Sequence, residues 1–268
     1  MVKRAHSTGG ATLAATVVII GLAACGGGGS TSGTVLARVG STPITRAELN
    51  HWMSSLAGAD YYGLSAKHTI PAGLVSDPPN FAACVAHLEA AAVPNKVSSQ
   101  PTGVQLLGKC RELYAALKRG AMEFLVGAEW VTGMARIVGV SLTEGELQQD
   151  FKRSTAERFT NDSEFHSYLT STRQSPSDRL LEVKLQVLGR AVVEKLAAAG
   201  KQGPRRLAEA ERRLTSETTC QPGYVVEHCK QFSPHTAIHL TQPASVLLEQ
   251  VASLATGRCT NLAACARQ

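Results

Sequence analysis

The stretch VLARVGSTPITRAEL, residues 35–49, determines how the folded part of the chain begins. A β-prone run of five residues is followed by a Gly-Ser turn signal and an extended X-Pro step. Thr45 and Glu48 then have the spacing of a capping box, which marks the first turn of a helix. This pattern predicts a short β element and a helix that starts near Thr45 and runs through Trp52 toward Leu56.

The next hundred residues divide into an irregular part and a long helical part. Residues 57–103 are rich in Gly and Pro, and we expect one short helix there, Phe81–Ala92, with Asn80 as its candidate cap. From Val104 apolar residues recur at helical spacings for about 35 residues. This predicts one long helix that stops at Gly139. Three glycines would weaken an isolated helix, so packing must stabilise it: Gly120, Gly127 and Gly133.

Further helix starts follow at regular intervals. Thr143 with Glu146 forms a second capping box, Asn161 precedes another start, and Ser175 caps a helix that opens with Pro176. That last helix carries an apolar stripe, which we interpret as a core face rather than a groove: Leu181, Leu185, Leu188, Val192 and Leu196. We expect Gly200 to end it.

Pro204 opens a last helix whose charged residues of both signs predict a solvated face: Arg205, Arg206, Glu209, Glu211, Arg212 and Arg213. The segment between Cys220 and Cys229 predicts a turn and a short β-prone run. A further amphipathic helix is expected near Ala244–Leu254. The predicted fold class is mostly α, with a short N-terminal β element.

The N-terminus has the pattern of an export signal. Lys3 and Arg4 precede an apolar run over 11–22, which is short for a membrane span. The run closes with Leu-Ala-Ala-Cys25, which looks like a bacterial lipobox and predicts Cys25 as the lipid attachment site. The alternative is an ordinary signal peptide with a chance cysteine. We therefore expect a signal peptide over 1–24 and a flexible Gly/Ser/Thr tether over 25–34, with the protein anchored at the extracytoplasmic face of a cell membrane.

Six cysteines remain beside Cys25, and an even set on an exported chain suggests disulfides. Six cysteines allow 15 pairings. Local spacing favours the one that consists of the disulfides Cys84–Cys110, Cys220–Cys229 and Cys259–Cys265. The third disulfide depends on proximity alone.

The composition excludes several classes of protein. The chain has 268 residues and a formal net charge of +6, which falls to +4 if residues 1–24, with Lys3 and Arg4, are removed. The only long apolar run is N-terminal, so a polytopic membrane protein is excluded. Aromatic residues make up only 5% of the chain, which argues against a lectin-like or single-strand nucleic-acid surface.

Taken in order, these segments resemble the SurA/PrsA-type envelope foldases, and in particular lipoproteins that carry a SurA-like N-terminal chaperone domain. The similarity covers roughly residues 35–230. It comprises the opening hairpin and helix, and then the following pieces: Asp77–Phe81 with Cys84, Cys110 and Tyr114; Phe124-Leu125 with Glu129-Trp130 and Gly139-Val140; Phe165–Leu169 with Asp178–Leu181; and Cys220–Val226 with Cys229. The resemblance implies a helical domain that binds unfolded chains.

The sequence departs from this family in one decisive place. Full foldases insert a parvulin prolyl-isomerase domain before the C-terminal helix, but here Leu196 and Cys220 leave no room for it. The resemblance therefore implies a short form without the parvulin domain. The tail over 231–268 is not explained by the family, and its role is unknown.

No motif nominates catalytic chemistry. Cys220, Cys229, His235 and His239 have a loose C-x8-C-x5-H-x3-H spacing, for which a disulfide and surface histidines are the simpler interpretation, so we expect no metal and no cofactor. His51, His87 and His166 are isolated, and capping explains Glu48 and Glu146. The Arg205–Arg213 cluster is interleaved with glutamates, so nucleic acid is not an expected partner.

The favoured function is a membrane-anchored holdase for unfolded or newly exported polypeptides. A peptidyl-prolyl isomerase and a structural envelope lipoprotein with one fixed partner remain as alternatives. No client-binding residues and no catalytic residues are assigned.

Overall fold

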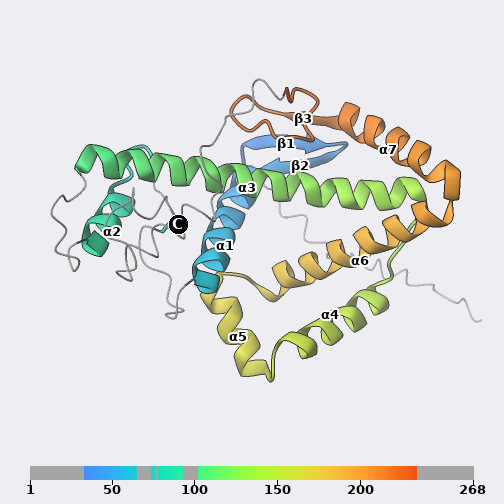
Figure 1. Ribbon diagram of the computed structural model, residues 1–268, viewed down its shortest axis with the longest axis horizontal. Coiled ribbons are helices and arrows are strands. Elements are labelled where there is room, and N and C mark those ends of the chain that lie inside the picture. The colour runs from blue at the N-terminus through green and yellow to red at the C-terminus, as the bar shows by residue number, and fades with distance from the viewer. Residues whose placement is uncertain (1–32, 65–73, 76–77, 93–101, 234–268) are drawn as a thin grey trace, which may run out of the picture. The chain divides into compact units, whose positions relative to one another are not determined.

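The computed structural model describes residues 33–64, 74–75, 78–92 and 102–233 (Figure 1). The signal peptide, Cys25 and the tether up to residue 32 lie outside the described residues, as does the tail from residue 234, with Cys259, Cys265, His235 and His239. The described part is mostly helical with a small N-terminal β element, as the sequence predicts. None of its helices is both long enough and apolar enough to cross a membrane.

A three-stranded antiparallel sheet joins the two ends of the described part. Strands β1 (Val35–Val39) and β2 (Thr42–Thr45) form the predicted hairpin, and β3 (Thr218–Cys220) pairs with β1 on its other edge. Ala37 lies opposite Cys220 in this pairing. The sequence predicted a β-prone run after Cys220 instead. That prediction is wrong, because residues 221–233 form turns and it is the three residues ending at Cys220 that join the sheet.

Seven α-helices complete the described part, and α3 packs against four of the others. They are α1 (Arg46–Leu64), α2 (Ala82–Ala92), α3 (Gly103–Val138), α4 (Glu144–Arg158), α5 (Asp162–Ser171), α6 (Pro176–Ala198) and α7 (Gly203–Glu217), with the 3-10 turn η2 (Gly200–Gln202) before α7. Helix α3 contacts α1, α2, α6, α7 and strand β1 (Figure 1). The main core therefore forms around α3.

The helix boundaries follow the predicted caps closely. The Thr45 backbone N–H donates to Glu48 at 2.7 Å, which confirms the first capping box, and Thr143 with Glu146 forms the second. Asn161 caps α5 and Ser175 caps α6. Ser175 and Asp178 also form a complete capping box, and a further box between Thr102 and Gln105, which is not among those predicted, opens α3.

Two helix predictions need correction. Helix α1 continues to Leu64, eight residues past the expected end at Leu56, because Ala57 is fully buried and packing overrides the weak helix propensity of Gly58. The short helix begins at Ala82 rather than Phe81, and Phe81 itself has a φ of +56°. Asn80 therefore does not cap it.

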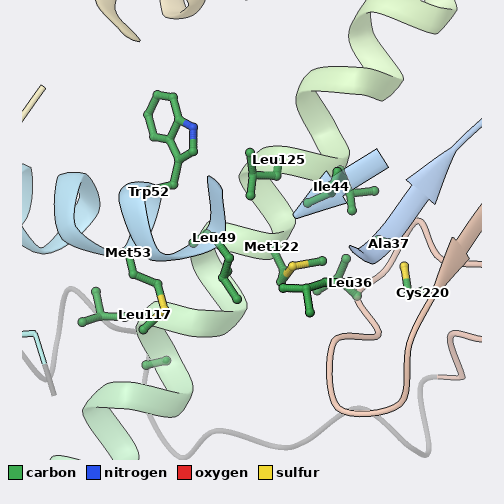
Figure 2. Close-up of a cluster of buried hydrophobic side chains, with 14 of the residues drawn as sticks. Leu36, Ala37, Ile44, Leu49, Trp52, Met53, Leu117, Met122, Leu125 and Cys220 are labelled. Atoms are coloured by element: carbon green, nitrogen blue, oxygen red, sulfur yellow. The ribbon is translucent and has the colours of Figure 1, made fainter. Parts of the chain in front are cut away.

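The main core lies between the sheet, α1 and α3. Figure 2 shows side chains of β1, β2, α1 and α3 meeting there beside Cys220 of β3. Leu36, Leu49 and Leu117 are fully buried. Burial of one such side chain stabilises the folded state by about 1.5–3 kcal/mol.

One glycine of α3 is explained by close packing. A Cβ on Gly133 would lie 2.7 Å from Cδ2 of the buried Leu214 of α7, so the missing side chain lets α7 approach α3 there. A Cβ on Gly120 would lie 3.7 Å from Leu56 of α1, which is an ordinary van der Waals contact, so no close approach requires glycine at that position.

A second, smaller core joins α4 and α5. It consists of Phe159, Phe165, Tyr168 and Leu169, with Phe151 packed against it. The α4–α5 part of the chain therefore has apolar contacts of its own.

Candidate functional site

An open apolar groove lies between α3 and α6. Helix α3 contributes Phe124, Gly127, Val131 and Met134, which recur at spacings of three and four and so share one helical face. Leu185, Gly189 and Val192 form the corresponding face of α6. Ala128, Trp130, Glu123 and His228 complete the lining. The cavity volume is about 370 Å³, within the range of small-ligand and peptide side-chain pockets.

The apolar stripe predicted for α6 is divided by this groove. Leu188 and Val192 are buried, whereas Leu181 and Leu196 are half-buried against the core. Leu185 is half-buried and lines the groove. The interpretation of the whole stripe as core is therefore wrong at Leu185, because α6 packs against α3 along only part of its length.

Two glycines lie in the groove wall without a structural reason inside the described chain. A Cβ on Gly127 or on Gly189 would meet no atom within 4 Å, and neither residue has a positive φ. Each glycine weakens its helix by about 1 kcal/mol relative to alanine. One position on each of the two helices that form the groove therefore lacks a side chain, at a cost in helix stability.

The aromatic rings of Trp130 and His228 form one side of the groove. The Trp130 indole N–H donates to Thr218 Oγ1 at 2.8 Å, and the Thr218 hydroxyl donates to the Leu214 carbonyl at 2.7 Å. His228 stacks on Trp130 with ring centroids 4.1 Å apart. The hydrogen bond fixes the indole, so this wall is rigid and mostly apolar.

The loop that carries His228 is held in place by several contacts. Cys229 forms a disulfide with Cys220, and Tyr224 accepts a hydrogen bond from Arg46 at 2.7 Å. Lys118 lies 5.2 Å from the centre of the Tyr224 ring. Contacts from β3, α1 and α3 thus position the edge of the groove.

The described lining of the groove is mostly apolar. Among the described residues that line it, Glu123 and His228 carry the ionisable side chains, and Glu123 is exposed and accepts a hydrogen bond from Arg119 at 2.8 Å. The surface can bury apolar groups of a bound chain.

The cysteines that the sequence singled out form two disulfides in the described part. Cys84 is bonded to Cys110, and Cys220 to Cys229, which are two of the three disulfides that local spacing favours. The Cys220–Cys229 disulfide agrees with the simpler interpretation of the C-x8-C-x5-H-x3-H spacing, in which the two cysteines are bonded to each other. Within the described ranges no group of three His, Cys, Asp or Glu side chains could hold a metal ion.

The isolated histidines have separate structural roles. His51 lies 2.9 Å from Asp178 Oδ1 and so links α1 to the start of α6. His166 contacts the Asp162 carbonyl of its own helix at 2.8 Å. Burial lowers the pKa of His87. None of the three lines the groove.

Two carboxylates with displaced pKa values are explained by helix caps. Burial raises the pKa of Asp178, but hydrogen bonds from Ser175 and His51 outweigh this effect and hold the pKa below its ordinary value. Hydrogen bonds from Thr143 lower the pKa of the exposed Glu146. Both groups serve the starts of helices, so they nominate no acid–base chemistry.

Sequence reasoning missed the groove because each of its walls has an ordinary helical pattern. The signal that points to it is a pair of glycines inside helices, of which Gly127 was interpreted only as a position that weakens the long helix and Gly189 was not singled out. Comparison of the chain with models of known protein families, with curated proteins and with solved structures found no match. What the groove binds has therefore to be inferred from its own side chains.

Proposed function

We propose that the protein is a lipid-anchored holdase at the extracytoplasmic face of a cell membrane, and that the groove between α3 and α6 binds apolar segments of unfolded exported polypeptides. The observation that carries the proposal is the groove itself. Its walls are apolar, it is open, and Gly127 and Gly189 let a chain approach the helix backbones. Burial of exposed apolar surface is the interaction by which a holdase would delay aggregation.

The resemblance to SurA/PrsA-type foldases supports the same proposal. Strand β3 adds a third strand to the opening hairpin. The segment between α6 and β3 consists of η2 and α7. An inserted parvulin domain is therefore not part of the proposal. Because only η2 and α7 lie between α6 and β3, where full foldases insert the isomerase domain, the holdase is favoured over the prolyl isomerase.

Residues 33–268 provide the material for the test. All described core contacts lie within residues 33–233. The oxidised protein is added to an unfolded model substrate, and its aggregation is followed by light scattering. Proline-limited refolding is measured in the same samples. Suppressed aggregation with unchanged refolding kinetics supports a holdase, whereas faster refolding supports the isomerase.

A matched pair of variants on α6 tests whether the groove is the client site. Leu185→Gln places an amide in the groove, and Val193→Gln makes the same kind of change at an exposed position of the same helix, where Val193 is 66% accessible. Removing the apolar contact of Leu185 should cost about 1 kcal/mol, or roughly a fivefold loss of client affinity. Val193→Gln should leave client affinity unchanged. Equal affinities for the two variants would place the clients elsewhere.

The membrane anchor needs its own test, because the groove does not depend on it. Metabolic labelling with a radioactive fatty acid should mark the wild-type protein in its native envelope. Labelling should disappear in Cys25→Ala. Label that persists in this variant would exclude Cys25 as the attachment site and leave an ordinary export signal.

A single fixed partner is the remaining alternative. Such a protein would ignore generic unfolded chains in the scattering assay. Stoichiometric crosslinking to one envelope protein would then identify the partner.

A further inference from the structure

The chain leaves the described part of the protein beside the groove. His228 lines the groove, and only five positions separate it from Ser233, the last described residue. The Lys230 backbone N–H donates to the Thr218 carbonyl at 3.0 Å, and the Phe232 N–H donates to the Cys229 carbonyl at 2.8 Å. The first bond ties Lys230 to Thr218, whose hydroxyl accepts the hydrogen bond of the groove-lining Trp130, so the described chain ends three residues after a link to the groove wall.

The sequence beyond Ser233 contains one apolar segment that matches the groove in chemistry. Residues 244–254 read ASVLLEQVASL, with a single charged residue, Glu249. Leu247, Val251 and Leu254 have the spacing of one helical face. The groove also presents aliphatic and small residues, so both surfaces would lose apolar area to each other on contact.

The connection between the two is long enough. Ten residues, 234–243, separate the exit point from this segment. A chain of that length spans at most about 33 Å and has an r.m.s. extension of roughly 17 Å if it is flexible. Because the exit point adjoins the groove, this reach suffices.

We propose that the segment Ala244–Leu254 occupies the groove between α3 and α6 when no client is bound. Occupancy of the groove by this segment does not depend on the holdase function. Its consequence, competition between the protein's own tail and its clients, rests on the proposed function. A short tether gives an effective concentration on the order of 1 mM, so a segment with a Kd of about 0.1 mM as a free peptide would fill the groove about nine-tenths of the time. The tail then weakens client binding roughly tenfold.

Site-specific photocrosslinking tests the occupancy without any client. A photoreactive amino acid is placed at Leu185 in the groove, and at Val193, outside it on the same helix, as the matched control. The protein used is residues 33–268, mixed as labelled and unlabelled copies so that adducts within one chain are distinguished from adducts between chains. We expect crosslinks from position 185, but not from 193, to peptides within residues 244–254 of the same chain. An adduct to a second copy, or none to these residues, would overturn the proposal.

Two double variants of the tail refine the result. Leu247→Gln with Val251→Gln removes apolar groups from the proposed contact and should abolish the adduct. Ser245→Gln with Ser253→Gln changes polar residues of the same segment and should preserve it. Loss of the adduct in both pairs, or in neither, would overturn the assignment of Leu247 and Val251 as the contacting residues.

The client assay separates this proposal from the proposed function. If both hold, the Leu247/Val251 variant binds an unfolded substrate about tenfold more tightly than the wild type, and the Ser245/Ser253 variant does not. If the crosslink forms but neither protein affects aggregation, the tail occupies the groove and the holdase function fails. If aggregation is suppressed equally in all variants and no tail adduct forms, the holdase remains and self-occupancy fails.

Discussion

The two glycines in the groove wall make the sharpest prediction, because stability and binding should change in opposite directions there. A Cβ at Gly127 or Gly189 would meet nothing within 4 Å. Replacing a helical glycine with alanine at such a position stabilises a helix by about 1 kcal/mol. Gly127→Ala with Gly189→Ala should therefore raise the free energy of unfolding by about 2 kcal/mol. For a domain of roughly 200 residues this corresponds to an increase in Tm of about 4–8 °C.

Client binding should become weaker in the same double variant. Each new methyl group extends from its helix into the groove by about one carbon–carbon bond, roughly 1.5 Å. A gap of only 0.5–1 Å forfeits about a quarter to a half of the dispersion energy of each contact that it separates. In the Leu247→Gln/Val251→Gln background, where the tail does not compete for the groove, a client that lies on these two positions should lose several-fold in affinity, although the protein that binds it has become more stable.

A second glycine pair controls for stability alone. Gly108 of α3 and Gly145 of α4 also have no atom within 4 Å of a Cβ, but they lie outside the groove. Gly108→Ala with Gly145→Ala should give the same gain in Tm, measured by thermal unfolding of oxidised residues 33–268, without loss of client affinity. Equal client affinity in the two double variants would refute the groove as client site. A lower Tm in the Gly127→Ala/Gly189→Ala variant would contradict the conclusion that a Cβ fits at these positions without a clash.

Three further predictions concern the framework of the site. Thr218→Val leaves the buried Trp130 N–H without its acceptor and should lower the free energy of unfolding by about 1–3 kcal/mol; a urea titration that shows no loss would contradict this role of the hydrogen bond. Cys84→Ala with Cys110→Ala opens a link across 26 positions, for which loop-closure entropy predicts a loss of about 3.6 kcal/mol, measured against wild type under oxidising conditions; equal stability would show that α2 does not depend on the link. The pKa of Asp178 is depressed in the folded state, so its ionised form stabilises the protein at neutral pH, and this contribution is lost as pH falls through the folded pKa. Asp178→Asn should therefore be less stable than wild type at pH 7, and the difference should vanish in acid; a difference independent of pH would contradict the assignment.

Local signals predicted most of the helical framework. Capping residues such as Thr143 and Ser175 act within one helical turn, so their effect can be read from neighbouring residues, and the structure places both as predicted. The stop at Gly139 is equally local, since its φ of +76° suits glycine. Where the sequence failed, distant contacts decided the outcome. Helix α1 extends to Leu64 through burial of Ala57, and β3 forms only because β1 offers an edge.

The candidate site could be predicted only in part, for the same physical reason. The face of α6 that includes Leu185 is visible as a periodic stripe, but periodicity does not show which residues of a stripe meet a neighbouring helix. The contribution of His228 depends on the disulfide-closed loop that brings it onto Trp130. A groove is a relation between elements far apart in the chain, so no local pattern contains it.

Glycine on α3 has two different effects. At Gly133 a Cβ would lie 2.7 Å from Cδ2 of the buried Leu214, so a side chain there would force Leu214 to shift. At Gly127, six residues earlier on the same helix, no positive φ and no neighbouring atom of the described chain favours glycine. Gly108 and Gly145 are equally uncrowded, so free space alone does not mark a binding surface; what distinguishes Gly127 and Gly189 is that both line one apolar groove. In the two proposals above, a client segment and the tail segment 244–254 occupy this surface in turn, so photocrosslinking tests the tail and the glycine variants test the client.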